Sequence, residues 1–145
     1  MKILAINAEL HIIAGRTNWK EPLRLQICFT DGSTLRLGVS GDGEGLILDR
    51  LPLEPPMDLE EHGRTETFDF TDRLEPTLKG VLIGEPAAIR SSAGRLIGLA
   101  VPRPGGEPFC IWINGDAFRW GPQAGIEEDY WVDDDIPALG GPLFE

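Results

Sequence analysis

The densest group of potentially functional side chains lies at residues 127–135, where the sequence reads EEDYWVDDD. Aromatic side chains are enriched in binding hot spots, and surrounding acids speed the encounter with a basic partner. The segment is therefore a candidate site for binding a basic protein. The alternative is a solvated acidic strand whose Trp131 packs back on the protein's own core. The candidate residues are Glu127, Glu128, Asp129, Tyr130, Trp131, Asp133, Asp134 and Asp135.

The patterns typical of metal and phosphate sites are incomplete in this sequence. Asp133 to Asp135 could ligate Ca²⁺ or Mg²⁺, but consecutive acids on an extended chain point alternately to opposite faces. The run SGDGEG at 40–45 lacks the Lys-Ser/Thr of a P-loop and the closing Glu of an EF-hand, so a turn is expected. Two cysteines and two histidines give no zinc-binding spacing. We expect no metal and no other cofactor.

Cys110 is the best single candidate for a catalytic nucleophile. The predicted hairpin register places Arg119 across the strand from it, where a cation would favour the thiolate. No GxSxG motif is present and no histidine lies nearby in the sequence, so an inert thiol is favoured. His11 could be a general base, although a hydrogen-bonded histidine is the ordinary outcome in an apolar strand. The sequence favours a non-enzymatic binding protein, and the alternative is a small enzyme or ligand-binding β domain using Cys110 or clustered carboxylates.

A β-hairpin at 108–121, PFCIWINGDAFRWG, is the element that would position Cys110. Asn114 and Gly115 suit the two loop positions of a type I′ turn, which needs positive φ at both. On the face of this hairpin that points away from the core, Cys110 lies opposite Arg119 and Trp112 lies opposite Ala117. The core-facing pairs in this register are Phe109 with Trp120, Ile111 with Phe118 and Ile113 with Asp116.

A second hairpin is predicted at 23–39, where apolar and polar residues alternate. A two-residue turn at Asp31 and Gly32 would send the apolar rows of its strands to opposite faces. A three-residue loop, 30–32, with Gly32 in the left-handed conformation of a bulge, keeps them together. This register pairs Ile27 with Leu35, Leu25 with Leu37 and Leu23 with Val39. The core residues predicted from both hairpins are Leu25, Ile27, Phe29, Leu35, Leu37, Phe109, Ile111, Ile113, Phe118 and Trp120.

The remaining chain reads as short strands joined by turns rich in Gly and Pro. One or two strands are expected within 3–13, and others at 46–51, 65–70, 80–90 and 96–101, with a proline-rich and acidic connection at 52–63. One short helical segment is expected at 72–79, because Asp72 and Glu75 have the spacing of a capping box.

These elements predict an all-β protein with at most one short helix, formed by two antiparallel meanders packed as a β-sandwich or open barrel. The expected organisation is one domain, 1–145, with an acidic C-terminal segment at 125–145. A pseudo-repeat of 1–51 and 80–121 is an alternative to chance similarity between Gly-rich β segments. Exposed edge strands of such sheets are also where a second copy of the chain could pair to form a homo-oligomer.

Charge restricts the classes of partner. The chain has 24 acidic and 13 basic residues, a net charge of −11, and no Lys or Arg follows Arg119. Such a surface repels phosphate backbones and anionic lipid, so neither nucleic acid nor membrane is an expected partner. No stretch resembles a secretory signal or a transmembrane helix, which predicts a cytoplasmic protein.

Four short motifs support one resemblance. They are MDLEEHG at 57–63 in a Leu- and Pro-rich middle, FDFTD at 68–72, a Gly followed by apolar residues at 80–83, and an aromatic-flanked Asn-Gly-Asp at 114–116. In these the chain resembles small acidic bacterial proteins of unassigned function, some of which are thought to be immunity partners of bacterial toxins. The resemblance implies an inhibitor or binding module and names no catalytic residue.

Overall fold

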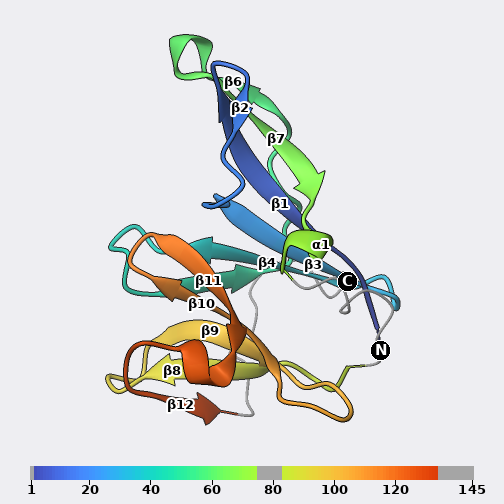
Figure 1. Ribbon diagram of the computed structural model, residues 1–145, viewed down its shortest axis with the longest axis vertical. Helices are drawn as coiled ribbons and strands as arrows, with labels where there is room; N and C mark the ends of the chain where they lie inside the picture. Colours follow the sequence, from blue (N-terminus) through green and yellow to red (C-terminus); the bar gives the residue numbers. More distant parts are fainter. Residues whose placement is uncertain (1, 75–82, 134–145) are drawn as a thin grey trace.

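The computed structural model describes residues 2–74 and 83–133, which form two antiparallel β-sheets packed against each other (Figure 1). The two sheets are separate and share a hydrophobic core, so the predicted all-β sandwich is confirmed and the open barrel is not the architecture. Between the sheets, the ring of Phe70 meets the ring of Trp120 edge-on, with 5.6 Å between centroids.

The first sheet contains seven strands in the order β5-β4-β3-β1-β7-β6, with β2 paired to β1. A short 3₁₀ helix, Glu60–His62, separates β6 from β7. The strands are β1 (Ile3–Ile13), β2 (Arg16–Thr17), β3 (Arg24–Phe29), β4 (Thr34–Val39), β5 (Leu46–Asp49), β6 (Met57–Asp58) and β7 (Arg64–Asp69).

The second sheet contains five strands in the order β11-β10-β9-β8-β12. A second 3₁₀ helix, η2 (Gln123–Gly125), follows β11. The strands are β8 (Ala87–Ser91), β9 (Leu96–Val101), β10 (Phe109–Asn114), β11 (Ala117–Pro122) and β12 (Tyr130–Asp133).

The two sheets have the same strand order. Apart from the two-residue β2, the first begins with the meander β1, β3, β4, β5, and β7 then pairs with β1. The second begins with β8, β9, β10, β11, and β12 then pairs with β8. The predicted pseudo-repeat, 1–51 and 80–121, spans these meanders and agrees with this order, while common descent of the halves stays a prediction.

The hairpin of β3 and β4 has the predicted register. Leu25 pairs with Leu37 and Ile27 with Leu35, across a loop in which Gly32 has a φ of +88°. The predicted pair of Leu23 with Val39 is wrong, because Leu23 precedes β3 and is exposed. The inner face of this hairpin is buried, and its outer face stays partly exposed.

The hairpin of β10 and β11 forms with a register two residues away from the prediction. Ile111 pairs with Trp120 and Ile113 with Phe118, so Gly115 and Asp116 are the loop residues. Only Gly115 of these two has positive φ, which fits a type II′ turn and not the predicted type I′ turn. A two-residue shift leaves every side chain on its predicted face, so the predicted core survives the error.

Strand β10 is buried on both faces, which the sequence did not indicate. Trp112, predicted on the non-core face, is 4% exposed and lies opposite Gly98 of β9. A Cβ atom at residue 98 would come within 2.8 Å of the Cβ of Trp112 and 2.5 Å of the Ile111 carbonyl oxygen. Strand β9 therefore approaches the backbone of β10 so closely at this point that only glycine fits at residue 98.

The helix α1 (Thr71–Leu74) begins before its predicted position at 72–79. The Oδ1 atom of Asp69 accepts hydrogen bonds from both the backbone N–H and the hydroxyl group of Thr71. The Thr71 hydroxyl oxygen in turn accepts the N–H of Ile6, which fixes the turn to β1. Asp69 thus forms the turn that leads into α1, whereas Asp72 lies inside the helix, and residues 75–79 lie outside the described residues.

Other element bounds differ in detail from the predictions. The apolar stretch 3–13 is a single strand, and the strand predicted at 46–51 ends at Asp49. Within the strand predicted at 80–90, the described residues 83–86 are not in a strand, and β8 begins at Ala87. The connection 52–63 includes the two-residue β6, which pairs with β7.

Candidate functional site

The described part of the acidic and aromatic segment, 127–133, follows η2 and includes β12, at one edge of the second sheet (Figure 1). Strand β12 pairs antiparallel with β8, placing Trp131 opposite Arg90 and Asp133 opposite Ala88. Within the described residues β8 is its only strand neighbour, so its other edge presents backbone N–H and C=O groups. The candidate site is therefore a strand edge.

Two of the candidate acids make contacts within the protein. An oxygen of Glu127 accepts a hydrogen bond from the indole Nε1 of Trp112 at 2.9 Å. This bond lowers the pKa of Glu127 below its usual value, because it stabilises the carboxylate. Asp133 forms an ion pair with Arg90, with 3.2 Å between Oδ2 and Nε. These two side chains hold the segment against the sheet.

The aromatic residues of β12 lie on opposite faces of the strand. Tyr130 is half-buried and packs against the core, whereas Trp131 is 47% exposed and is not among the side chains packed there. The neighbouring Val132 is 39% exposed. Trp131 therefore presents an apolar surface to solvent, unlike the alternative in which it packs back on the core.

Of the four remaining candidate acids, two lie among the described residues and two lie outside them. Glu128 and Asp129 are exposed and directly precede β12. Asp134 and Asp135 lie outside the described residues. The candidate surface that the structure brings together consists of Glu128, Asp129, Trp131 and Val132 with the outer edge of β12, and we call it the β12 edge.

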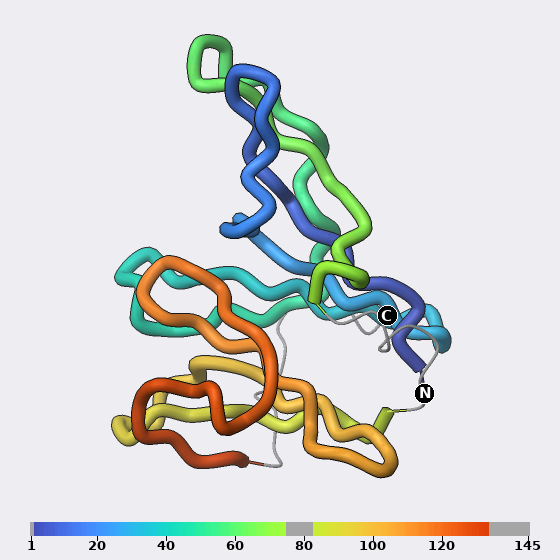
Figure 2. The backbone as a smooth tube through the Cα atoms, viewed as in Figure 1, coloured from blue at the N-terminus to red at the C-terminus, as the bar shows by residue number. Residues whose placement is uncertain are grey.

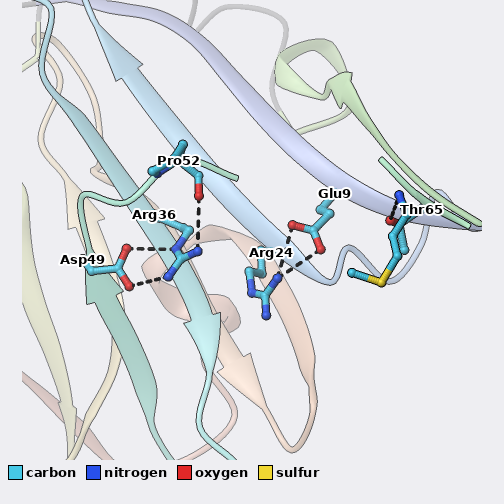
Figure 3. A network of polar contacts seen from close by, with 7 residues as sticks. Glu9, Arg24, Arg36, Asp49, Pro52 and Thr65 are labelled. Atoms are coloured by element: carbon cyan, nitrogen blue, oxygen red, sulfur yellow. Dashed lines mark hydrogen bonds and ion pairs between the residues drawn. The ribbon is translucent and has the colours of Figure 1, made fainter. Parts of the chain in front are cut away.

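The outer face of the first sheet carries a polar network that sequence reasoning missed (Figure 3). Arg36 of β4 binds both carboxylate oxygens of Asp49 in β5, at 2.9 and 2.8 Å, and donates to the carbonyl oxygen of Pro52 at 3.2 Å. Nearby, Arg24 pairs with the buried Glu9 at 3.1 Å. Each pair joins adjacent strands, so the network stabilises strand pairing. Arg36 and Asp49 are 13 residues apart, and only their register could have linked them.

Cys110 does not have the environment predicted for a nucleophile. It is fully buried, and the residue opposite it is Gly121, because Arg119 lies opposite Trp112. Burial, with a smaller effect of Glu107, raises the pKa of Cys110 to about 11. The thiol is therefore protonated at neutral pH and shielded from solvent. The alternative of a thiolate stabilised by Arg119 is therefore wrong, and the inert thiol that the sequence favoured agrees with this environment.

Neither histidine nor the glycine-rich turn forms a catalytic or metal-binding cluster. A ring nitrogen of His11, Nε2, makes a hydrogen bond with the His62 carbonyl oxygen, as expected for a hydrogen-bonded histidine. The segment 40–45 is a turn, in which Asp42 pairs with Arg95 of the turn between β8 and β9 at 2.7 Å. Among residues 2–74 and 83–133, no three His, Cys, Asp or Glu side chains are grouped as metal ligands.

Comparisons with known proteins provide no relative from which a function could be transferred. The chain matches no protein-family model, no curated protein and no solved structure. The described part of the chain also contains no helix with the length and apolar character needed to cross a membrane.

Proposed function

We propose that this protein is a non-enzymatic binding module whose β12 edge receives a basic, extended segment of a partner protein. The observation that supports this proposal best is Trp131, a half-exposed tryptophan on a strand with an open edge in the described residues. Large aromatic side chains usually pack in the protein core. An exposed tryptophan beside an open strand edge therefore indicates a surface that contacts a partner.

Strand addition is the binding mode that this surface supports. A partner strand would pair its backbone with the open edge of β12, while Trp131 and Val132 contact side chains on opposite faces of the new strand. The exposed Glu128 and Asp129, together with the net charge of −11, favour lysine and arginine in that partner. Masking a basic surface in this way is also what a toxin-neutralising protein would do, in keeping with the resemblance in short motifs.

The proposal is tested with two synthetic peptides of equal length, one alternating Lys and Val and the other alternating Glu and Val. We expect the basic peptide to shift the backbone amide signals of β12 and β8 in NMR spectra, and to bind more weakly as salt increases. Trp131→Ala should weaken binding about tenfold, equivalent to the loss of a hot-spot side chain. Equal binding of the two peptides would contradict the proposal.

The matched control is Ile47→Ala in β5, an edge strand of the first sheet. Ile47 is 48% exposed, close to the 47% of Trp131, so both variants remove a similarly exposed apolar side chain from a sheet edge. Peptide affinity should be unchanged in Ile47→Ala. An equal loss in both variants would indicate non-specific adhesion to apolar edges.

The alternative, an enzyme or ligand-binding domain using Cys110 or clustered carboxylates, has no comparable support. Cys110 is buried with a raised pKa, and the carboxylates of Glu9, Asp49 and Asp133 each pair with an arginine of a neighbouring strand. Binding through the β12 edge is therefore the better supported of the two proposals.

A further inference from the structure

A pocket of about 370 Å³ lies where β11 of the second sheet meets the loop before β3 and the turn of α1. Figure 2 shows that loop and the α1 turn close to the strand β11, which is drawn in orange. The volume falls within the range of roughly 300–1,000 Å³ that is usual for small-molecule sites. The lining residues are Trp19, Lys20, Arg73, Phe118, Arg119 and Trp120.

Aromatic rings connect the two sides of this pocket. Trp19 contacts Phe68 with 5.1 Å between ring centroids, and its ring is nearly parallel to that of Phe70 at 6.4 Å. Phe70 is fully buried and meets Trp120 edge-on. Trp19 and Trp120 are both half-buried, so each is held by the core and still has ring surface exposed. The pocket therefore has a fixed aromatic wall on each side.

The charged side chains among the described residues that line the pocket are all cationic. Lys20, Arg73 and Arg119 are exposed, and among the described residues none of them forms an ion pair. Among the described residues no carboxylate lines the pocket, although acidic residues outnumber basic ones by 24 to 13 in the chain. Three cationic side chains grouped in so acidic a protein create a local site that attracts a small anion.

The guanidinium group of Arg73 is oriented for such a contact. It stacks on the ring of Trp19, with 4.1 Å between Cζ and the ring centroid. Stacking uses the flat face of the guanidinium and leaves its N–H groups, at the edge, free to donate to a carboxylate. Arg119 is held beside the pocket because its Nη1 donates to the Phe118 carbonyl oxygen at 3.2 Å.

We propose that this pocket binds a small aromatic carboxylate, with the ring between Trp19 and Trp120 and the carboxylate at Arg73 and Lys20. The two tryptophans supply the apolar contact area, and the cations select the charge of the ligand. This site is separate from the β12 edge and does not depend on the proposed function. Its ligand is anionic, whereas the β12 edge receives a basic segment.

The four tryptophans of the chain allow a direct test in the full-length protein. Addition of 2-naphthoate should shift the indole N–H signals of Trp19 and Trp120 in NMR spectra. The signals of Trp112, which donates to Glu127, and of Trp131 in β12 should not move. Shifts confined to Trp131, or no shifts at millimolar ligand, would overturn the proposal.

Two further ligands separate the contributions of ring and charge. The uncharged 2-naphthalenemethanol keeps the ring, and acetate keeps the carboxylate. Each should bind at least about tenfold more weakly than 2-naphthoate, because a charge-assisted hydrogen bond or the aromatic contact is lost. Equal affinity for the neutral alcohol would show that the cations do not select the ligand and would overturn the proposed class.

Variants locate the contact with the carboxylate. Arg73→Gln should weaken 2-naphthoate binding about tenfold, and Lys20→Gln should weaken it less, because lysine is a single flexible point charge. Arg16→Gln is the control, since Arg16 is exposed, lies in β2 and is outside the pocket. Lys20 is exposed and outside the core, so its variant tests the site even where Arg73→Gln alters the fold. Unchanged affinity in Lys20→Gln and Arg73→Gln alike would contradict the proposal.

Discussion

The two sheets have the same strand order but are covered differently on their outer faces. In the first sheet, β3 alternates between buried and half-exposed residues. In the second, the inner strand β10 is buried from Phe109 to Ile113 without interruption. Strand order alone therefore does not decide whether a strand is buried on one face or two.

The difference arises from the connection that follows the last strand of each meander. It leads from β5 to β7 in the first sheet and from β11 to β12 in the second. Strands β11 and β12 lie at opposite edges of their sheet, so the connection between them crosses one face. It passes over Trp112, where a Cβ atom at residue 125 would be 3.3 Å from the ring and Glu127 accepts the indole N–H. The corresponding connection in the first sheet contacts the outer face through the Pro52 carbonyl oxygen and Arg36. One return is held by an aromatic residue and the other by an ion-paired arginine.

The largest expected effect comes from removing the residue that makes the second sheet different. Trp112→Ala should lower the free energy of unfolding by about 3–5 kcal/mol, the usual loss for a buried tryptophan. Gln26→Ala, on the outer face of β3, should change it by no more than about 0.5 kcal/mol. Urea denaturation of both variants measures this contrast. Similar losses would show that the outer faces are equivalent.

Gly98→Ala tests the same face without removing the indole. The new methyl group would be 2.5 Å from the Ile111 carbonyl oxygen, so the strand or Trp112 must shift. We expect a loss of about 1–3 kcal/mol in the free energy of unfolding, which is typical of overpacking. Gly38→Ala in β4 is the matched control, because a Cβ atom there meets nothing within 4 Å. Equal stability of the two variants would indicate that β9 and β10 can move apart at this point without cost.

The polar cover of the first sheet should contribute less. Asp49→Asn removes the charge that Arg36 binds and keeps the shape, and both side chains are less than one-fifth exposed. We expect a loss of about 1–2 kcal/mol, because Arg36 retains only part of its hydrogen bonding. A double-mutant cycle with Arg36→Met measures the coupling. A coupling energy near zero would show that this pair does not stabilise strand pairing.

The smallest expected effect concerns how the connection between β11 and β12 makes the stability of the fold depend on pH. Because the pKa of Glu127 in the folded protein is below the usual value of 4.5, its carboxylate stabilises the fold above that value. This contribution is lost as pH falls through the folded-state pKa. Glu127→Gln should therefore flatten the decrease in thermal stability from about pH 5 to about pH 3. Parallel curves for wild type and variant would contradict this role, and Glu128→Gln is the control.

Local patterns were sufficient to predict the fold class and most of the core. The alternation in β3 and β4 fixed their register, because a slip by one residue would expose Leu25 and Ile27. The turn at Asn114 and Gly115 was misjudged because Asn-Gly suits a type I′ turn, while the alternative turn at Gly115 and Asp116 preserves the same faces.

The features that sequence reasoning missed all depend on contacts between distant segments. The burial of Trp112 requires the return connection, and the pocket at Trp19 requires β11 to lie beside α1. Trp131 is exposed, as the predicted binding surface requires, and its role in binding stays a prediction, while Glu127 and Asp133 belong to internal contacts that periodicity cannot reveal. Spacing along a strand predicts its faces, whereas the segment that covers a face is determined by topology.

In each sheet the strand that follows the meander pairs with the first strand of that meander, β7 with β1 and β12 with β8. This order of pairing has a consequence for biosynthesis. The ladder of the first sheet is complete when Asp69 can reach Asn7, before any strand of the second sheet has been translated. Its apolar inner face must then wait for β8 to β11 to emerge from the ribosome. Exposed apolar surface at this stage promotes aggregation. The nascent chain therefore has a vulnerable interval, and a chaperone that binds apolar surfaces would be most effective during it.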